Sequence, residues 1–171
     1  MPISPEHAIA VRDFLVPTIE KEQETTRKVI LAVPPDRLQY APDERSMKAA
    51  DLAWHIVSAE HYFCTRVVKG EFDRPELKRP EELERPDQIV AWYDERRGSA
   101  LDGIRRLTPD QCARELNFFD VFKLSGVGFL QFMLNHSVHH RGQLSAYLRP
   151  MGAKVPAIYG RSGDEMPGRT E

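Results

Sequence analysis

Apolar residues recur at helical spacing along four long stretches of this 171-residue chain, and no stretch alternates convincingly as a strand would. The four predicted helices cover residues 4–32, 46–69, 86–107 and 125–151, with a polar crossover over 72–85. Helices that each have one apolar face become stable when those faces pack together. The pattern therefore predicts an all-α fold, a four-helix bundle with a long crossover between the second and third helices.

Capping and helix-breaking residues define the predicted helix ends. Ser4 and Ser46 are suitable N-caps for the first two helices, and Gly70 is a suitable stop for the second. Pro17 lies inside the first helix, where its missing amide predicts a kink or a short break. A short helical turn is predicted over residues 108–116, before the last long helix.

Composition indicates one ordinary soluble domain. Hydrophobic residues make up 41% of the chain and charged residues 29%, with a net charge of −2 and no basic block. We therefore expect no nucleic-acid partner and no membrane partner. No signal peptide is recognisable, which predicts a cytoplasmic protein. Residues 1–160 are predicted to form the domain, and residues 161–171 a flexible tail.

The two cysteines, Cys64 and Cys112, both lie in helical patterns and have no paired spacing. Two such isolated residues predict neither a disulfide framework nor a thiolate zinc site. Histidines are the better candidates for a metal centre.

His136 and His140 lie four residues apart in the last predicted helix. Residues at that spacing are about 6 Å apart on one helix face, so both imidazoles can reach one metal ion. On a helical wheel both share a face with large apolar residues, whereas His139 points about 60° to the other side.

The same construction on the second helix places His55 on the apolar face and His61 on the outside. The wheels thus select three inward histidines, His55, His136 and His140. Buried imidazoles need polar partners, and a shared metal ion would satisfy all three. The alternative is that each is an ordinary hydrogen-bonded core residue, and the wheels alone leave both interpretations open.

Several segments of the chain resemble the DinB/YfiT-like superfamily of small four-helix bundle proteins. They are residues 46–48 with 54–56, the histidine-rich run 136–144 and the closing residues 155–160, and the likeness extends over about residues 4–160. The resemblance implies an up-down-down-up bundle, often a homodimer, that binds a divalent metal through one histidine of the second helix and two of the fourth. On this chain those ligands are His55, His136 and His140.

The resemblance also implies a reaction. The expected metal is Zn²⁺, with Ni²⁺ or Fe²⁺ as alternatives, because all-nitrogen ligation suits each of them. The expected enzyme uses a low-molecular-weight thiol, such as bacillithiol, mycothiol or glutathione, in an S-transferase or isomerase reaction. Hydrolysis by metal-bound water is a related possibility. The competing hypothesis is a metal-binding stress or accessory protein without catalysis.

Each metal-ligating histidine should have an acceptor for its second ring nitrogen. The candidates are Glu60, Asp51, Gln143 and backbone carbonyls. Arg141 could hold an acidic co-substrate, but the wheel turns it away from the histidines. We therefore expect Arg141 to form a structural ion pair at the edge of the bundle.

Overall fold

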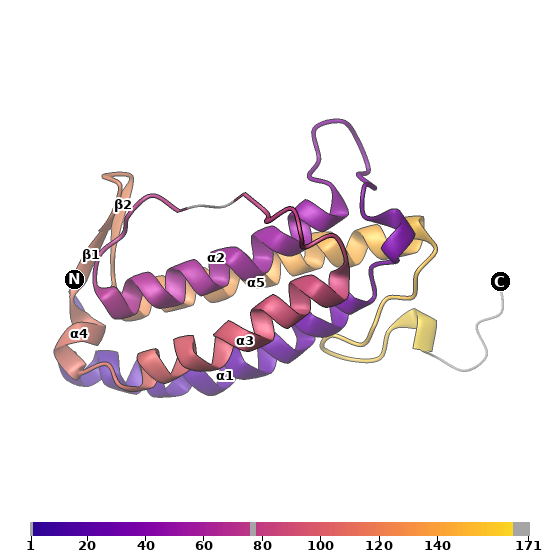
Figure 1. The fold of residues 1–171 in the computed structure, drawn as a ribbon. Helices are drawn as coiled ribbons and strands as arrows, with labels where there is room; N and C mark the ends of the chain where they lie inside the picture. The colour runs from indigo at the N-terminus through magenta and orange to yellow at the C-terminus, as the bar shows by residue number, and fades with distance from the viewer. Residues whose placement is uncertain (1, 76–77, 166–171) are drawn as a thin grey trace.

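Four long helices form a bundle in the computed structural model, which describes residues 2–75 and 78–165 (Figure 1). They are α1 (Pro5–Leu31), α2 (Ala49–Lys69), α3 (Pro86–Arg105) and α5 (Gly126–Leu148). α2 packs against α3 and α5, and α1 packs against the same two helices. In Figure 1, α1 and α5 run in one direction and α2 and α3 in the other. The predicted up-down-down-up bundle is therefore confirmed, as is the long crossover between α2 and α3.

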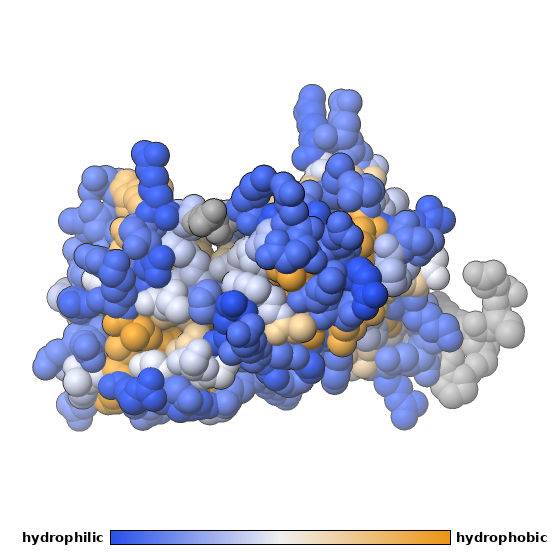
Figure 2. Space-filling model, viewed as in Figure 1, coloured by the Kyte–Doolittle hydropathy of each residue, from blue (hydrophilic) through white to orange (hydrophobic). Residues whose placement is uncertain are grey.

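Shorter elements close the ends of the bundle. They are α4 (Pro109–Ala113), the strands β1 (Glu115–Phe118) and β2 (Phe122–Ser125), and 3-10 turns at Pro35–Arg37, Arg149–Met151 and Gly163–Glu165. The face shown in Figure 2 is largely hydrophilic, with scattered apolar patches. Within residues 2–75 and 78–165, we find no helix that is both long and apolar enough to cross a membrane.

The hairpin of β1 and β2 was not predicted from the sequence. The short helix that was expected to reach Leu116 ends at Ala113, and Leu116 instead pairs with Leu124 across the hairpin. Each strand has only four residues, too few to give a clear alternating pattern. The turn also lacks the glycine that usually indicates a hairpin in a sequence. Phe119 and Asp120 adopt its positive φ angles, 52° and 59°, instead.

Most of the predicted helix ends agree with the structure. The Ser4 hydroxyl accepts a hydrogen bond from the His7 amide at the start of α1. Gly70 ends α2 in the left-handed region, with φ 84°. Ser46 is not an N-cap, because α2 begins three residues later and the Ser46 hydroxyl donates to Asp43. At Pro17, where a kink or a short break was predicted, α1 continues as one helix. Pro17 is exposed, so water can satisfy the carbonyl that loses its partner there.

The predicted C-terminal tail begins at residue 161. Asp164 accepts a hydrogen bond from the Val155 amide and pairs with Arg149, so residues 163–165 lie against the preceding segment. Residues 166–171 lie outside the described part of the chain, and their predicted flexibility stays a prediction.

Two clusters of buried apolar side chains fill the bundle, one toward the hairpin and one toward the loop between α1 and α2. The buried Glu60 carboxyl lies between them on α2. It accepts hydrogen bonds from Gln23 Nε2 at 2.7 Å, from the Tyr93 hydroxyl, and from Ser137 Oγ at 3.2 Å. Burial raises the pKa of Glu60, and these hydrogen bonds act in the opposite direction. All four helices therefore meet at one carboxyl group.

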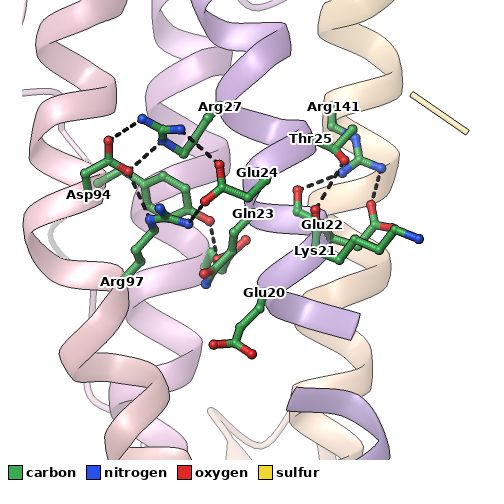
Figure 3. Close-up of polar contacts among 12 residues, drawn as sticks. Glu20, Lys21, Glu22, Gln23, Glu24, Thr25, Arg27, Asp94, Arg97 and Arg141 are labelled. Atoms are coloured by element: carbon green, nitrogen blue, oxygen red, sulfur yellow. Dashed lines mark hydrogen bonds and ion pairs between the residues drawn. The ribbon is translucent and has the colours of Figure 1, made fainter. Parts of the chain in front are cut away.

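Arg141 joins α5 to α1 and is only 1% exposed. Its guanidinium lies 2.5 Å from the Glu22 carboxylate and donates to the Glu22 carbonyl oxygen at 3.1 Å (Figure 3). It also donates to the Tyr159 hydroxyl at 2.6 Å. The structural ion pair predicted for Arg141 is present, but it is buried between two helices instead of lying at the edge.

A second group of ion pairs joins α1 to α3. Arg27 lies 2.7 Å from Asp94, and Arg97 lies 2.6 Å from Glu24 and 2.9 Å from Asp94 (Figure 3). Because the charges alternate around this group, each carboxylate is shared by basic side chains from both helices. These pairs are partly exposed, so water screens them and each one contributes little to stability.

We expect Arg141→Leu to lower the free energy of unfolding by about 3–5 kcal/mol, because Glu22 would be left nearly buried without its partner. Arg149→Leu is the matched control, since the Arg149 side chain is 60% exposed in its pair with Asp164. That control should cost less than about 1 kcal/mol. Urea unfolding followed by circular dichroism measures both, and equal losses would contradict the assigned role of Arg141.

Candidate metal centre

Three histidines from two neighbouring helices converge between α2 and α5. His55 comes from α2, and His136 and His140 come from α5. One ring nitrogen from each lies within 4.8 Å of the other two. The ring centroids are 4.4 to 4.9 Å apart. The structure thus brings together the three histidines that the helical wheels selected, and this cluster could hold a metal ion.

The closest pair of nitrogens tests whether the cluster fits an ion. His55 Nε2 and His136 Nε2 are 3.1 Å apart. Two nitrogens that each bind one ion at about 2.0–2.1 Å in a tetrahedral site lie about 3.3 Å apart. All three histidines are half-buried, so each keeps some contact with solvent. The donor set and its spacing therefore suit a divalent ion with imidazole ligands.

Gln143 orients His140. Its Oε1 lies 3.0 Å from His140 Nδ1, and its Nε2 donates to the Tyr147 hydroxyl at 3.2 Å. An amide oxygen can only accept, so this contact assigns the proton to Nδ1 and leaves the Nε2 lone pair of His140 free. Gln143 therefore supports a candidate ligand, as predicted. Asp51, another predicted support, pairs with Arg79 instead.

His136 is uncharged at neutral pH, the form in which an imidazole can bind a metal ion. Burial, followed in size by the charges of the neighbouring His140, His55 and His139, lowers its pKa to about 4. Burial also lowers the pKa of His55, followed in size by the effect of His140. Metals bind neutral imidazole, so no proton has to leave His136 at neutral pH. Its Nδ1 is buried without a hydrogen-bond partner among the described residues.

The sequence model of the DinB family matches residues 13–170. The chain belongs to the DinB family. It is 32% identical over 130 residues to the uncharacterized protein YjoA of Bacillus subtilis (strain 168), covering 74% of this chain and 82% of that protein. It is also 24% identical over 154 residues to the uncharacterized protein YrdA of the same organism, covering 90% of each.

Solved structures show the same fold. A DinB-like protein of Bacillus cereus ATCC 10987 matches this DinB chain with a TM-score of 0.71 at 23% identity, covering 85% of this chain and 95% of that one. The crystal structure of YjoA from B. subtilis, also a DinB-like protein, matches with a TM-score of 0.68 at 24% identity, covering 86% and 98%. At these identities the likeness supports the fold alone.

The two histidines that the wheels rejected lie outside the cluster of this DinB protein. His139 is exposed, with its ring 4.8 Å from that of His140. His61 is not on the outside as predicted: it is half-buried, with its ring 5.4 Å from that of Trp92. The wheel describes one helix at a time, so it could not show that α3 covers this side of α2.

Sequence reasoning missed the aromatic residues beside the cluster. The rings of Phe63 and Phe132 lie 6.2 and 6.3 Å from that of His136. Phe122 of the hairpin packs on Phe132 at 5.3 Å. The three phenylalanines come from α2, β2 and α5, so no single periodic pattern could have grouped them.

We expect the metal-free protein to become less stable as the pH falls from about 6.5 to about 4. Over that interval an unfolded histidine, whose ordinary pKa is about 6.5, binds a proton that the folded His136 does not bind. Protonation therefore favours the unfolded chain. The contribution of neutral His136 to stability is fully present above the pKa of a histidine in the unfolded chain. It is lost as the pH falls toward the lower pKa of His136 in the folded protein.

His136→Gln should flatten this part of the profile, measured as the free energy of unfolding in urea at a series of pH values with a chelator present. His55 contributes with the same sign, because its pKa is also lowered. A variant whose profile runs parallel to that of the wild type would contradict the burial of neutral His136.

Proposed function

We propose that this DinB-family protein binds a divalent metal ion through His55, His136 and His140 and uses it for catalysis on a small molecule. The supporting observation is the convergence of three ring nitrogens within 4.8 Å, on three half-buried histidines. Zn²⁺ is the first candidate, and Ni²⁺ or Fe²⁺ the alternatives, because all three accept imidazole ligands.

The proposed reaction is transfer or isomerisation with a low-molecular-weight thiol, and hydrolysis by water is the related possibility. An ion with three neutral imidazole ligands keeps open positions, where it lowers the pKa of a bound thiol or water. The protein's own part is to hold the ligands in place. Gln143 fixes the orientation of His140, and the low pKa of His136 keeps that ring available.

The alternative is a metal-binding stress or accessory protein without catalysis. It would use the same three ligands, so metal binding alone does not separate the two functions. The half-buried positions of the histidines favour the enzyme, because a site that only stores or senses an ion can be closed completely. The homodimer that the family resemblance implies stays a prediction, as does the cytoplasmic location expected from the sequence.

His140→Ala should weaken metal binding by at least about 100-fold, since loss of a supporting contact alone typically costs 10–100-fold. His139→Ala is the matched control, because His139 is the adjacent and exposed histidine of the same helix. Metal content after dialysis and calorimetric titration with Zn²⁺ measure the difference. Equal metal content in both variants would overturn the proposed centre.

Thiol chemistry needs a separate test, in which the wild-type protein loaded with Zn²⁺, Ni²⁺ or Fe²⁺ is assayed with a panel of thiols and electrophiles. We expect turnover with at least one metal, its loss in His140→Ala and its retention in His139→Ala. Metal bound in stoichiometric amount without turnover of any thiol or hydrolysis of any ester would instead support the accessory function.

A further inference from the structure

An aromatic shelf lies on the hairpin side of the histidine cluster. We use this name for Phe63, Phe122 and Phe132. The rings of Phe63 and Phe122 lie 5.4 and 5.3 Å from that of Phe132. Phe132 is 36% exposed, one helical turn before His136. The rings of Phe63 and Phe132 both lie within 6.3 Å of the His136 ring. A molecule that reaches the cluster from this side therefore meets aromatic carbon first.

A second layer of rings holds the shelf in place. Phe72 of the crossover, Phe118 of β1 and Phe129 of α5 pack behind it. Phe72 and Phe129 are 4.5 Å apart, and Phe118 stacks on Phe122 at 5.1 Å. A ring that is packed on several sides loses little further freedom when a ligand covers its exposed edge. The hairpin and the crossover thus preorganise the shelf for binding.

The exposed face of α5 provides no fixed charge beside the cluster. Its exposed residues include no Asp, Glu, Lys or Arg, in a chain in which 29% of the residues are of these types. They are Gln131, Phe132, Asn135, His139, Gly142 and Ala146. Arg141, the one arginine of this lysine-free helix, is buried and paired with Glu22. An acidic substrate group has no guanidinium on this helix to bind.

We propose that the small molecule which reaches the metal carries an uncharged, ring-sized apolar group, and that this group packs on the aromatic shelf with Phe132 as its main contact. The proposal rests on the proposed function, because it names the class of molecule which that site accepts. It assigns Phe132 to specificity and leaves the three histidines as the groups that hold the metal.

The test uses Co²⁺-loaded protein and two thiol probes, benzyl mercaptan and 2-mercaptoethanol, titrated while the thiolate-to-cobalt absorption is recorded. Each thiol loses its proton to the buffer on binding. Ring stacking beyond simple burial corresponds to a factor of roughly ten in affinity. We therefore expect benzyl mercaptan to bind at least about tenfold more tightly than 2-mercaptoethanol to the wild-type protein.

Phe132→Ser should remove this preference while leaving Co²⁺ content and the affinity for 2-mercaptoethanol unchanged. Phe132→Tyr, which retains the ring, should keep the preference. Phe14→Ser is the matched control, because Phe14 is 75% exposed on α1, a helix that contributes no ring to the shelf.

The outcomes separate this inference from the function on which it rests. Absence of Co²⁺ binding, or of any thiolate absorption, would overturn the metal centre or its thiol chemistry, and the inference with it. Thiolate absorption with equal affinities for the two probes would overturn the inference alone. A preference that survives in Phe132→Ser would also overturn it, since the shelf would not be its source.

Discussion

Glu60 receives one hydrogen bond from each of the other long helices, through Gln23 of α1, Tyr93 of α3 and Ser137 of α5. A buried carboxyl group is costly unless its oxygens are satisfied, so arrangements that remove these donors are strongly disfavoured. The contact sets the rotation and the axial position of each helix around α2. His136 precedes Ser137, and His55 lies five residues before Glu60. Packing around this carboxyl therefore also brings the two histidines together, with their Nε2 atoms 3.1 Å apart.

The Arg141 contact acts on the same helix from the other side. Successive residues point about 100° apart around a helix, so burying Arg141 against α1 turns His140 toward α2. The ion pair thus contributes to the site without touching it. The two contacts hold α5 between α1 and α2, with Arg141 facing one neighbour and His136 and His140 facing the other. Gln143 then completes the orientation of His140 from within α5.

Helix positions and the inward histidines could be predicted because both depend on local periodicity. A period of 3.6 residues, with caps such as Ser4 and stops such as Gly70, defines a helix and the residues on its apolar face. The same periodicity placed His55, His136 and His140 inward and identified Gln143 as a supporting residue. It failed for His61, because the cover there comes from α3 and not from the helix on which His61 lies.

Local patterns determined the helices, the apolar face of each one and the three candidate ligands of this protein. Only the tertiary structure decided which side chains meet across helices: the donors to Glu60, the buried pair of Arg141 with Glu22, and the phenylalanines around His136. The β1–β2 hairpin belongs to the second group, since its short strands have a weak pattern and Phe118 and Phe122 gain their partners from α5 and the crossover. Contacts between residues far apart in the chain arise from packing the whole bundle, and a periodic pattern within one segment carries no information about them.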